Sequence, residues 1–441
     1  MYSMKKLFTT LVTVATTLNM MAQPPADSTP KYPSGATKQY SSGTNSLTNE
    51  TLSSSTQYYN VVQVTGGTLT MTDCILSKTG SGSGGDNSSF YGNNSSIYAG
   101  AASSSNYWST TAASGAKIVI NNCTVTSSSQ GANAVIATNG ATVEIDGITI
   151  VNNSSVSRGL HATYEGIINA SNVNITTNEA TSSTIATDRG GGTVTVNGGT
   201  ATANGSKSAV IYSTGTMSAT DLVGTSAKGE IAVIEGDNSI AMTNCTMTSG
   251  SSERGLLMMQ SGSGDASGVN PVMTITGTSL TMTDTSAPLL EVATCVNATC
   301  TLDNCTLSVP SGVIMYVMDD SQWSTSGAVG NLILANGSYS GTVKYDSGYT
   351  ANVTVNSGAT WNLTSDTSIC SLTNNGTINK NGYTLTYTSL SGSGTINEES
   401  AVKAVSEAPA SVSDGKVYTL DGRATNVDNG LLIKGGNKII K

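Results

Sequence analysis

The chain of 441 residues is poor in charged and aromatic side chains, which make up 11% and 5% of it, and it contains only two phenylalanines. Its formal net charge of -9 leaves no basic stripe for nucleic acid and no attraction to an anionic membrane. Hydrophobic residues nevertheless reach 37% and are spread evenly, unlike those of a disordered chain. The composition therefore predicts a folded protein that does not bind nucleic acid.

Two further absences concern cysteine motifs and apolar runs. The seven cysteines form no CxxC pair, so neither a zinc site nor a redox motif is supported, and we expect no metal or cofactor. No apolar run after residue 21 could cross a membrane, so we expect no transmembrane segment in the mature chain. Residues 1–22 place Lys5 and Lys6 before a short apolar stretch, which is typical of a signal peptide.

The chain also lacks the 3.6-residue period of a helix, and it has an internal repeat instead. The phrase "IAMTNCTMTSG" returns in altered forms, each with Asn, Asp or Gly at one position. These positions are Asp73, Asn122, Gly147, Asn172, Gly198, Asp221, Asn244, Gly277 and Asn304. From Asn122 onward they are 25, 25, 26, 23, 23, 33 and 27 residues apart. Because these residue types accept positive φ most readily, we predict a tight turn at each position.

Strands are predicted on both sides of this turn. Ile240 and Met242 alternate with other residues before the turn, and Cys245 and Met247 do so after it, as in strands with one buried face. A second short run, such as "AVIYS" or "AVIEG", follows in each repeat. The pattern predicts an all-β fold, a right-handed parallel β-helix solenoid with about 23–27 residues per coil.

One inward position of these coils is expected to hold cysteine or an aliphatic residue. Its expected occupants are Cys74, Cys123, Ile148, Val173, Leu222, Cys245 and Cys305. A small hydrophobic residue suits that position, so buried thiols are favoured over disulfides. An odd number of cysteines cannot pair completely within the chain, and a disulfide between Cys295 and Cys300 stays open.

Composition divides the chain into successive segments. Residues 23–60 are rich in Ser, Thr and Pro and are expected to form a leader. Coils are expected over 61–398, with an insertion at 80–115, and the loop "QSGSGDASGVNP" explains the long step of 33 residues. Residues 399–412 are expected to be a linker, and 413–441 a short C-terminal β tail.

The tail contains "VYTLDGR" at Val417–Arg423, "NGLLIK" at Asn429–Lys434 and a Lys-rich end. In these pieces it resembles the C-terminal sorting signal of the type IX secretion system of Bacteroidetes-type bacteria. The resemblance implies that the secretion machinery reads this tail as an export address. The residues that it marks are Gly422, Arg423, Gly430, Lys438 and Lys441.

The middle of the chain carries the pieces "FYGNNSSIYAG", "IATDRGGGTVTVNGGT" and "VIEGDNSI". Here it resembles a family of bacterial right-handed β-helix proteins with a pectin-lyase-like solenoid that are described as adhesin-like. The resemblance implies the fold and a role in surface contact. It provides no catalytic motif that could be transferred to residues of this chain.

Many β-helix proteins cleave polysaccharides, so a polysaccharide lyase or glycoside hydrolase is the alternative function. Hydrolases of this fold bring Asp residues together across neighbouring coils, beside GHG-like and RIK-like pieces that are missing here. Asp73 and Asp221 occupy the turn position, and Asp146 and Asp303 precede it, so turn chemistry explains all four.

If the protein is an enzyme, the remaining catalytic candidates are Asp319, Asp320 and Arg189. Arg189 follows Asp188 in a Gly-rich turn, where a salt-bridged loop is the simpler interpretation. The single histidine, His161, is expected to be a packed member of a side-chain ladder rather than a general base. The other members expected in that ladder are Ile136, Ala186, Ile211, Ile234 and Leu257.

Aromatic side chains concentrate in the insertion, although the rest of the chain is poor in them. Tyr91, Tyr98, Tyr107 and Trp108 lie there, and Trp323 lies in "DDSQWSTSG". Exposed rings with a few polar donors are typical of glycan-binding surfaces. The same rings would also cover the open first coil, because solenoid ends must be capped. Both interpretations stay open.

A non-catalytic, adhesin-like protein that is secreted or displayed on the outer cell surface is therefore the favoured function. Its partners would be polysaccharides, or glycans and proteins of a host or neighbouring surface. Outward Thr residues, as in "TVTVNGGTATANG", would also suit a structural or ice-binding surface, but Ser, Asn and Ala interrupt that ladder.

Overall fold

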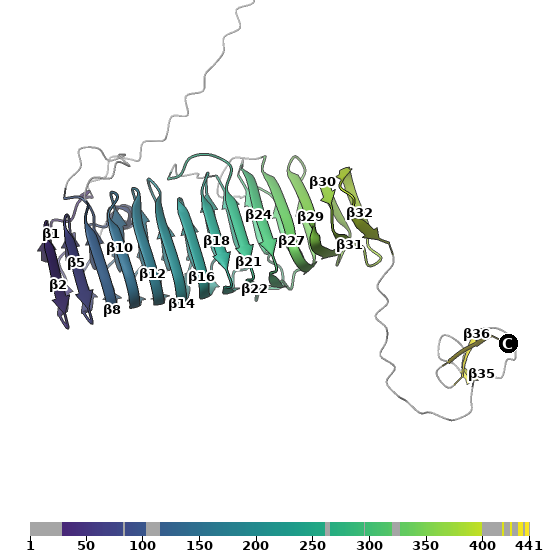
Figure 1. Cartoon of the computed structure of the whole chain (residues 1–441), viewed down its shortest axis with the longest axis horizontal. Coiled ribbons are helices and arrows are strands. Elements are labelled where there is room, and N and C mark those ends of the chain that lie inside the picture. Colours follow the sequence, from purple (N-terminus) through teal and green to yellow (C-terminus); the bar gives the residue numbers. More distant parts are fainter. Residues whose placement is uncertain are drawn as a thin grey trace, which may run out of the picture. The chain divides into compact units, whose positions relative to one another are not determined.

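A computed structural model of the chain confirms the all-β parallel β-helix. It forms two units, residues 1–398 and 399–441. In the first unit, all described strands belong to two long parallel sheets that stack coil upon coil (Figure 1). The residues described are 29–82, 84–102, 115–260, 265–294, 296–319, 327–398 and four short strands of the tail.

Sheet A contains 12 strands, one from each successive coil. They are, in spatial order, β1 (Gly35–Tyr40), β4 (Tyr59–Val64), β7 (Ile97–Ala99), β9 (Val135–Thr138), β11 (Leu160–Thr163), β13 (Ile185–Thr187), β15 (Ile211–Ser213), β17 (Ala232–Glu235), β20 (Leu256–Met259), β23 (Leu290–Ala293), β26 (Val313–Val317) and β28 (Thr342–Tyr345). Each pairs in parallel with the next, so residues one coil apart stack in register.

Sheet B contains the remaining strands of the solenoid, usually two per coil or one long strand. They are β2 (Thr44–Thr48), β3 (Thr51–Ser54), β5 (Thr68–Thr72), β6 (Ile75–Lys78), β8 (Lys117–Ser127), β10 (Thr142–Asn152), β12 (Gly166–Thr177), β14 (Gly192–Ser206), β16 (Thr216–Lys228), β18 (Ser239–Thr243), β19 (Thr246–Ser249), β21 (Val272–Thr276), β22 (Ser279–Met282), β24 (Asn297–Asp303), β25 (Thr306–Ser308), β27 (Val329–Ser340), β29 (Thr350–Asn362), β30 (Thr367–Asn374), β31 (Thr377–Asn379), β32 (Leu385–Ser391) and β33 (Thr395–Asn397). Inward side chains of both sheets form one continuous hydrophobic core.

The predicted turn is present at all nine positions. Their φ angles lie between 51° and 80°, in the left-handed region. The strands before and after the turn are not always separate, however. β8, β10, β12, β14 and β16 run through it as single strands of 11 to 15 residues. The left-handed residue shifts the inward–outward alternation of side chains by one position, while the strand stays paired with its neighbours. Ile120 and Cys123 therefore both face the core although they are three residues apart.

The cysteines expected inside the coils are buried free thiols. Cys74, Cys123, Cys245 and Cys305 lie in the core, and burial raises the pKa of Cys123 to about 11. In β14 the same position is Gly199, which pairs with Val173 and Leu222. Cys300 is also a buried free thiol and is therefore in no disulfide, whereas Cys295 lies outside the described residues.

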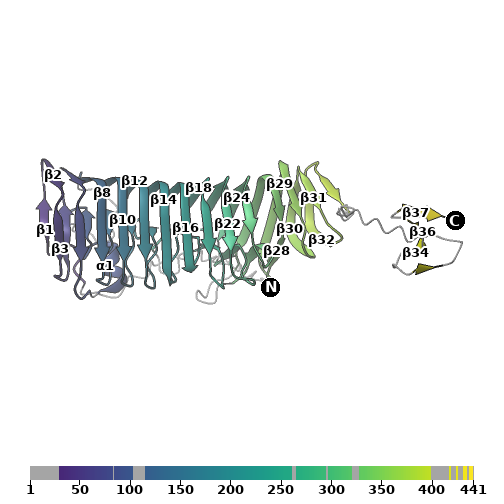
Figure 2. The same ribbon diagram turned by 90° about the horizontal axis from the view of Figure 1, so that it is seen from below.

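The solenoid begins within the segment expected to be a leader. β1, β2 and β3 precede Val61 and pair with the strands of the next coil, so the coils start at Gly35. The first coil contains 24 residues, counted from Gly35 to its partner Tyr59 in the next coil. The last contains 18, from Thr367 to Leu385, and sheet A has no strand beyond β28 (Figure 2).

The expected insertion is partly a coil. It contains α1 (Gly85–Tyr91) and the sheet A strand β7, while residues 103–114 lie outside the described part. α1 packs on the outer face of sheet A. The Asn133 side-chain amide donates to the Ser89 carbonyl at 2.7 Å, and the Thr163 hydroxyl donates to the Phe90 carbonyl at 3.0 Å. β7, β9 and β11 of sheet A are thus buried on both faces.

The tail forms a small antiparallel sheet of its own. Its strand order is β35 (Ala424–Thr425), β34 (Val417–Tyr418), β36 (Leu431–Lys434) and β37 (Asn437–Ile440). Within the described ranges, no helix has the length and hydrophobicity of a membrane span.

Candidate functional site

A groove of about 900 Å³ follows the outer face of sheet A, and we call it the outer-face groove. Side chains of a single outward ladder line it, one from each of six consecutive strands. These are Tyr212, Val233, Leu257, Glu291, Tyr316 and Lys344. Five strand spacings of ~4.8 Å give the ladder a length of roughly 24 Å, enough for a linear ligand.

His161 belongs to the same ladder, farther toward the first coil. It pairs with Ile136 and Ala186, as predicted, but Tyr212 and Val233 follow, not Ile211 and Ile234. The prediction for those two residues was wrong because they face the core. Runs such as "AVIE" are buried on both faces here, so hydrophobicity alone did not distinguish inside from outside.

His161 is fully buried with its Nε2 atom 3.3 Å from Oδ2 of Asp188. Burial, aided by the nearby Arg158 cation, lowers its pKa well below 6.5, so the ring is neutral at neutral pH. Burial also raises the pKa of Asp188 to about 7, although Arg158 opposes this. His161 is therefore a packed ladder member, as expected, and Asp188 is the carboxyl that titrates near neutrality.

Arg158 anchors α1 above this pair. Its guanidinium lies 3.4 Å from both Asp86 and Asp188, and it donates to the Ser89 hydroxyl at 3.2 Å. The same group lies 5.6 Å from the centre of the Phe90 ring. The buried end of the groove is thus closed by α1 through one arginine.

Arg189 joins two segments that are far apart in the sequence. Its Nε donates to Asp265 at 2.6 Å, and Nη1 donates to Asn87 of α1 at 2.9 Å. The guanidinium also lies 4.2 Å from the centre of the Phe90 ring. Asp265 follows β20, three sheet A strands beyond Arg189, so the loop reaches back about 14 Å along the solenoid. The predicted salt-bridged loop is confirmed, and it connects the loop to α1.

Arg254 forms the third charged cluster. It lies 3.0 Å from Glu230 and 3.0 Å from Glu291, both of which are nearly buried, and 3.5 Å from the exposed Glu253. Nearer the first coil, Tyr212 donates a hydrogen bond to Glu235. Burial and this carboxylate raise the pKa of Tyr212 well above 10. The carboxylates of the groove floor are therefore engaged by neighbouring side chains.

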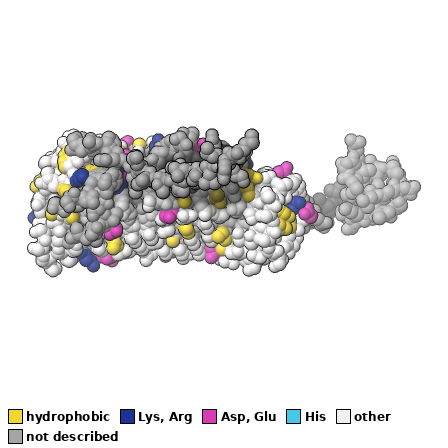
Figure 3. Space-filling model, turned by 90° about the horizontal axis from the view of Figure 1, so that it is seen from above, with side chains coloured by type: hydrophobic (Ala, Val, Ile, Leu, Met, Phe, Trp, Pro, Cys, Tyr) yellow, Lys and Arg dark blue, Asp and Glu magenta, His cyan; other side chains and the backbone are white. Residues whose placement is uncertain are grey.

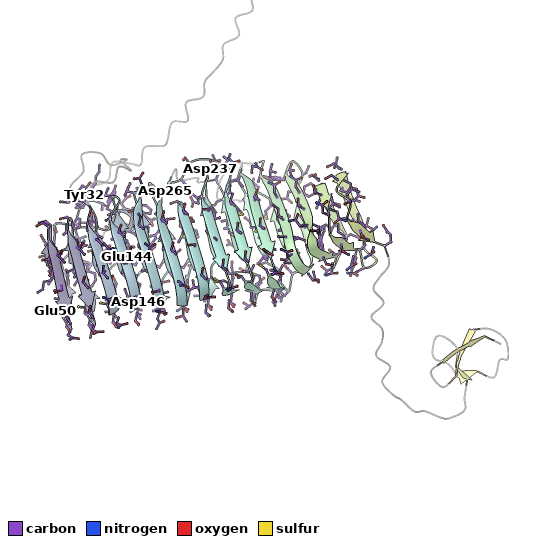
Figure 4. All side chains as sticks on the ribbon, in the orientation of Figure 1. Tyr32, Glu50, Glu144, Asp146, Asp237 and Asp265 are labelled. Carbon is purple, nitrogen blue, oxygen red and sulfur yellow. The ribbon has the colours of Figure 1, made fainter. Side chains whose placement is uncertain are left out.

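Asp265 lies at the same edge of the solenoid as Asp237, whereas Asp146 lies at the opposite edge (Figure 4). There Asp146 accepts from the side chains of Ser171 and Asn172, at 3.1 and 2.8 Å, which agrees with its predicted part in the turn. The part of the surface shown in colour in Figure 3 is mostly uncharged, with acidic and basic side chains in small separate patches.

Of the residues predicted to bind glycan, the two that the structure describes, Tyr91 and Tyr98, do not line the groove. Tyr91 and Tyr98 are buried, because their rings fill the space over the first coils, so they present no face to a ligand. The Tyr98 hydroxyl donates to the Ala101 carbonyl at 2.9 Å. Tyr107, Trp108 and Trp323 lie outside the described residues.

Of the catalytic candidates, Asp319 is exposed and lines the groove, Arg189 is paired as above, and Asp320 lies outside the described residues. In the tail, Lys438 lies on β37. The other sorting-signal positions fall outside the described part: Gly422, Arg423, Gly430 and Lys441.

Sequence reasoning missed the ladder residues Tyr212, Glu291, Tyr316 and Lys344. A signal for them exists, since each is a polar or amphipathic residue inside a short apolar run, as in "LLEVA" and "VIMYV". Such a residue must point away from the core.

In the described ranges, no three His, Cys, Asp or Glu side chains are arranged to hold a metal ion. Comparisons with protein-family models, curated proteins and solved structures give no match for this chain.

Proposed function

We propose that the protein is a secreted or surface-displayed adhesin-like β-helix that binds a polysaccharide chain without cleaving it. The outer-face groove carries this proposal. Its floor offers the partly exposed rings of Tyr212 and Tyr316, on either side of the buried apolar Val233 and Leu257, between charged and hydroxyl side chains. Sugars bind to such mixtures through their apolar ring faces and their hydroxyl groups.

The length of the groove supports a polymer rather than a small molecule. Its ladder extends over six strands, and a linear chain can follow strands that repeat at a constant spacing. Residues 1–22, which are typical of a signal peptide, and the tail that resembles a type IX sorting signal support export to the outer surface. There the ligand would belong to a host, a neighbouring cell or the surrounding matrix.

The pairing of the carboxylates favours binding over catalysis. A glycoside hydrolase needs one carboxyl that donates a proton and a second that acts as base or nucleophile. Glu230 and Glu291 share Arg254, and Asp265 is paired with Arg189. These ion pairs engage the three carboxylates with arginine side chains of the protein itself.

One observation favours the alternative of a glycoside hydrolase. Asp188 lines the groove, and its pKa of about 7 would allow it to donate a proton near neutral pH. Among β-helix hydrolases the second carboxyl would have to come from a neighbouring coil. Glu235 is the carboxylate of the groove that comes next after Asp188 along the sheet, two coils on.

The test is to incubate the full chain with a panel of host and plant polysaccharides, and to measure both retention and new reducing or unsaturated ends. We expect retention on at least one polymer and no cleavage. Tyr316→Ala should weaken retention about tenfold, since stacking on a ring contributes about 1 kcal/mol or more. Tyr387→Ala is the matched control, because Tyr387 is exposed on β32, away from the groove.

Cleavage that Asp188→Asn abolishes would contradict the proposal and support the hydrolase. Retention that is unchanged by Tyr316→Ala would show that the glycan binds elsewhere. A chain that neither retains nor cleaves any polymer would not be a glycan-binding protein of this kind.

A further inference from the structure

Two cysteines lie one above the other in neighbouring coils, on either side of the insertion that carries α1. β5 and β6 both pair with β8, and the register before and after the left-handed turn places Cys74 beside Cys123. The Thr124 amide donates to the Cys74 carbonyl at 2.9 Å, which continues the hydrogen bonding of the two coils through this position. The Cα atoms of the two cysteines are therefore one strand spacing apart, about 4.8 Å.

The side chains of these two cysteines have the same orientation. The Cys74 thiol donates to the Thr72 carbonyl, two residues before it, at 3.4 Å. The Cys123 thiol donates in the same way to the Asn121 carbonyl at 3.5 Å. Burial raises the pKa of Cys123 to about 11, and the adjacent groups of Cys74 also influence this pKa. The two thiols are thus direct neighbours in the core, one coil apart.

No other two of the six cysteines that the structure describes are placed in this way. Cys245 and Cys305 occupy the same inward position, but Thr278 lies in the coil between them. Cys300 on β24 and Cys370 on β30 have no cysteine on the strands that pair with theirs. Among the described cysteines, only Cys74 and Cys123 are therefore brought together by adjacent coils.

We propose that Cys74 and Cys123 form a disulfide when the chain folds under oxidising conditions, and that the two free thiols are the reduced form of this pair. Disulfides join residues whose Cα atoms are about 4.4–6.8 Å apart, and one strand spacing lies within that range. The bond requires the two side chains to rotate toward each other, with the loss of two weak thiol–carbonyl hydrogen bonds. It is independent of the proposed glycan binding.

The oxidant is a small disulfide such as oxidised glutathione, or the disulfide of an oxidoreductase. The thiolate of one cysteine attacks it, forms a mixed disulfide and releases one half of the oxidant as a thiol. The thiolate of the second cysteine then attacks the sulfur of the first and displaces the other half of the oxidant as a thiol. The pair of cysteines loses two protons and two electrons in total, and the oxidant takes up both.

Burial determines when this exchange occurs. The exposed fractions of Cys74 and Cys123 are 0% and 1%, so an oxidant does not reach them in the closed coil. The raised pKa of Cys123 also keeps it a thiol at neutral pH in the folded state. The mixed disulfide therefore forms in the open chain and is resolved as β8 pairs with β5 and β6. Once the coil is closed, the same burial protects the bond from reductants.

The bond closes the base of the insertion. The chain leaves the coil after β6, forms α1 and β7, and returns to the next coil with β8. A cross-link between the two ends of this excursion removes the freedom of a long loop from the unfolded chain. The oxidised protein is therefore more stable than the reduced one.

The experiment refolds the full chain from urea, once in a mixture of oxidised and reduced glutathione and once in a dithiol reductant. The remaining thiols are alkylated in urea, and linked peptides are identified by mass spectrometry. We expect a peptide that joins Cys74 to Cys123 in the oxidised sample alone, and alkylation of both thiols in the reduced sample. The urea concentration at the midpoint of unfolding should rise by on the order of 1 M on oxidation.

Cys245→Ala is the matched control, because it removes a thiol from the same inward position that has no cysteine beside it. It should leave the linked peptide in place, whereas Cys74→Ala should abolish that peptide and leave Cys123 alkylated. Alkylation of both Cys74 and Cys123 in the oxidised parent would overturn the proposal, and so would pairing of Cys74 with other cysteines as often as with Cys123. Oxidation of the folded, reduced protein as fast as that of the unfolded chain would overturn the proposed order of events.

Discussion

The two halves of the outward ladder on sheet A have the same backbone but different surroundings. Tyr98, Ile136, His161 and Ala186 are fully buried beneath α1 and its neighbours. On later strands Val233, Leu257 and Glu291 are still buried, but Tyr212 and Tyr316 are only partly buried and Lys344 is exposed. The strands, their spacing and their register are the same in both halves. The cover that an insertion provides therefore decides whether an outward residue is core or binding surface.

The largest expected effect removes the anchor of the covered half. Arg158→Ala would leave the buried Asp188 without its cation and would release α1, so we expect a loss of about 3 kcal/mol in the free energy of unfolding. Urea denaturation measures it. Asp86→Ala, which removes the exposed partner of the same arginine, should cost less than about 1 kcal/mol. Equal effects of the two variants would show that α1 is not anchored through the buried pair.

The next prediction uses pH to separate Asp188 from His161. The Asp188 pKa is raised from 3.8 to about 7 in the folded state, so its contribution to stability is present at low pH and is lost as the pH rises toward 7. The His161 pKa is lowered well below 6.5, so its contribution is present above pH 6.5 and is lost as the pH falls. In the parent protein the two groups therefore change the free energy of unfolding in opposite directions as the pH rises.

In Asp188→Asn only the pH dependence caused by His161 remains. The free energy of unfolding should therefore rise from pH 5 to 6.5, by at most about 1.4 kcal/mol per pH unit. His161→Gln should give the reverse sign over the same range. Urea titrations at several pH values measure both. Two variants with slopes of the same sign would contradict these assignments.

A smaller effect is expected where the two insertions meet. A double-mutant cycle with Arg189→Gln and Asp265→Asn should give a coupling energy of about 1 kcal/mol, because both side chains are largely buried and 2.6 Å apart. The same cycle with Arg189→Gln and Asp237→Asn is the control, since Asp237 accepts from Asn270 instead. A coupling near zero in the first cycle would mean that Arg189 does not join the two segments in solution.

The smallest effect is expected at the open end of the groove. Asp319→Asn should change the free energy of unfolding by less than about 0.5 kcal/mol, because Asp319 is exposed and forms no hydrogen bond or ion pair with another described side chain. It should also leave glycan retention unchanged. A large loss of any polysaccharide-cleaving activity in this variant would restore Asp319 as a catalytic candidate.

The periodic part of the molecule could be predicted from the sequence, because the same pattern of residues recurs in coil after coil. The left-handed turn at Asn122 or Asn244 was readable since nine positions share it. The start at Gly35 was missed because Ser and Thr dominate the first coil as they would a leader. Ile211 was wrongly assigned to the outward ladder because outward residues of sheet A are also buried, so hydrophobicity did not distinguish the two faces of the strand.

The candidate site could be predicted only in fragments. Arg189 was recognised as unexplained, but its partners Asn87 and Asp265 are 102 and 76 residues away and belong to insertions that follow no period. Contacts between two such segments depend on how far each folds back over the sheet. That distance is set by packing against residues such as Phe90 and Asn133, and no local pattern encodes it.

The unequal coils at the two ends of the solenoid have a consequence for self-assembly. A stack of strands can in principle grow without limit when its last layer matches its first. Here the first layer advances by 24 residues and includes a strand of sheet A, whereas the last advances by 18 and has none. A second copy added at the tapered end would leave β1 without a partner. The narrowing of the coils therefore disfavours end-to-end stacking of one solenoid on another.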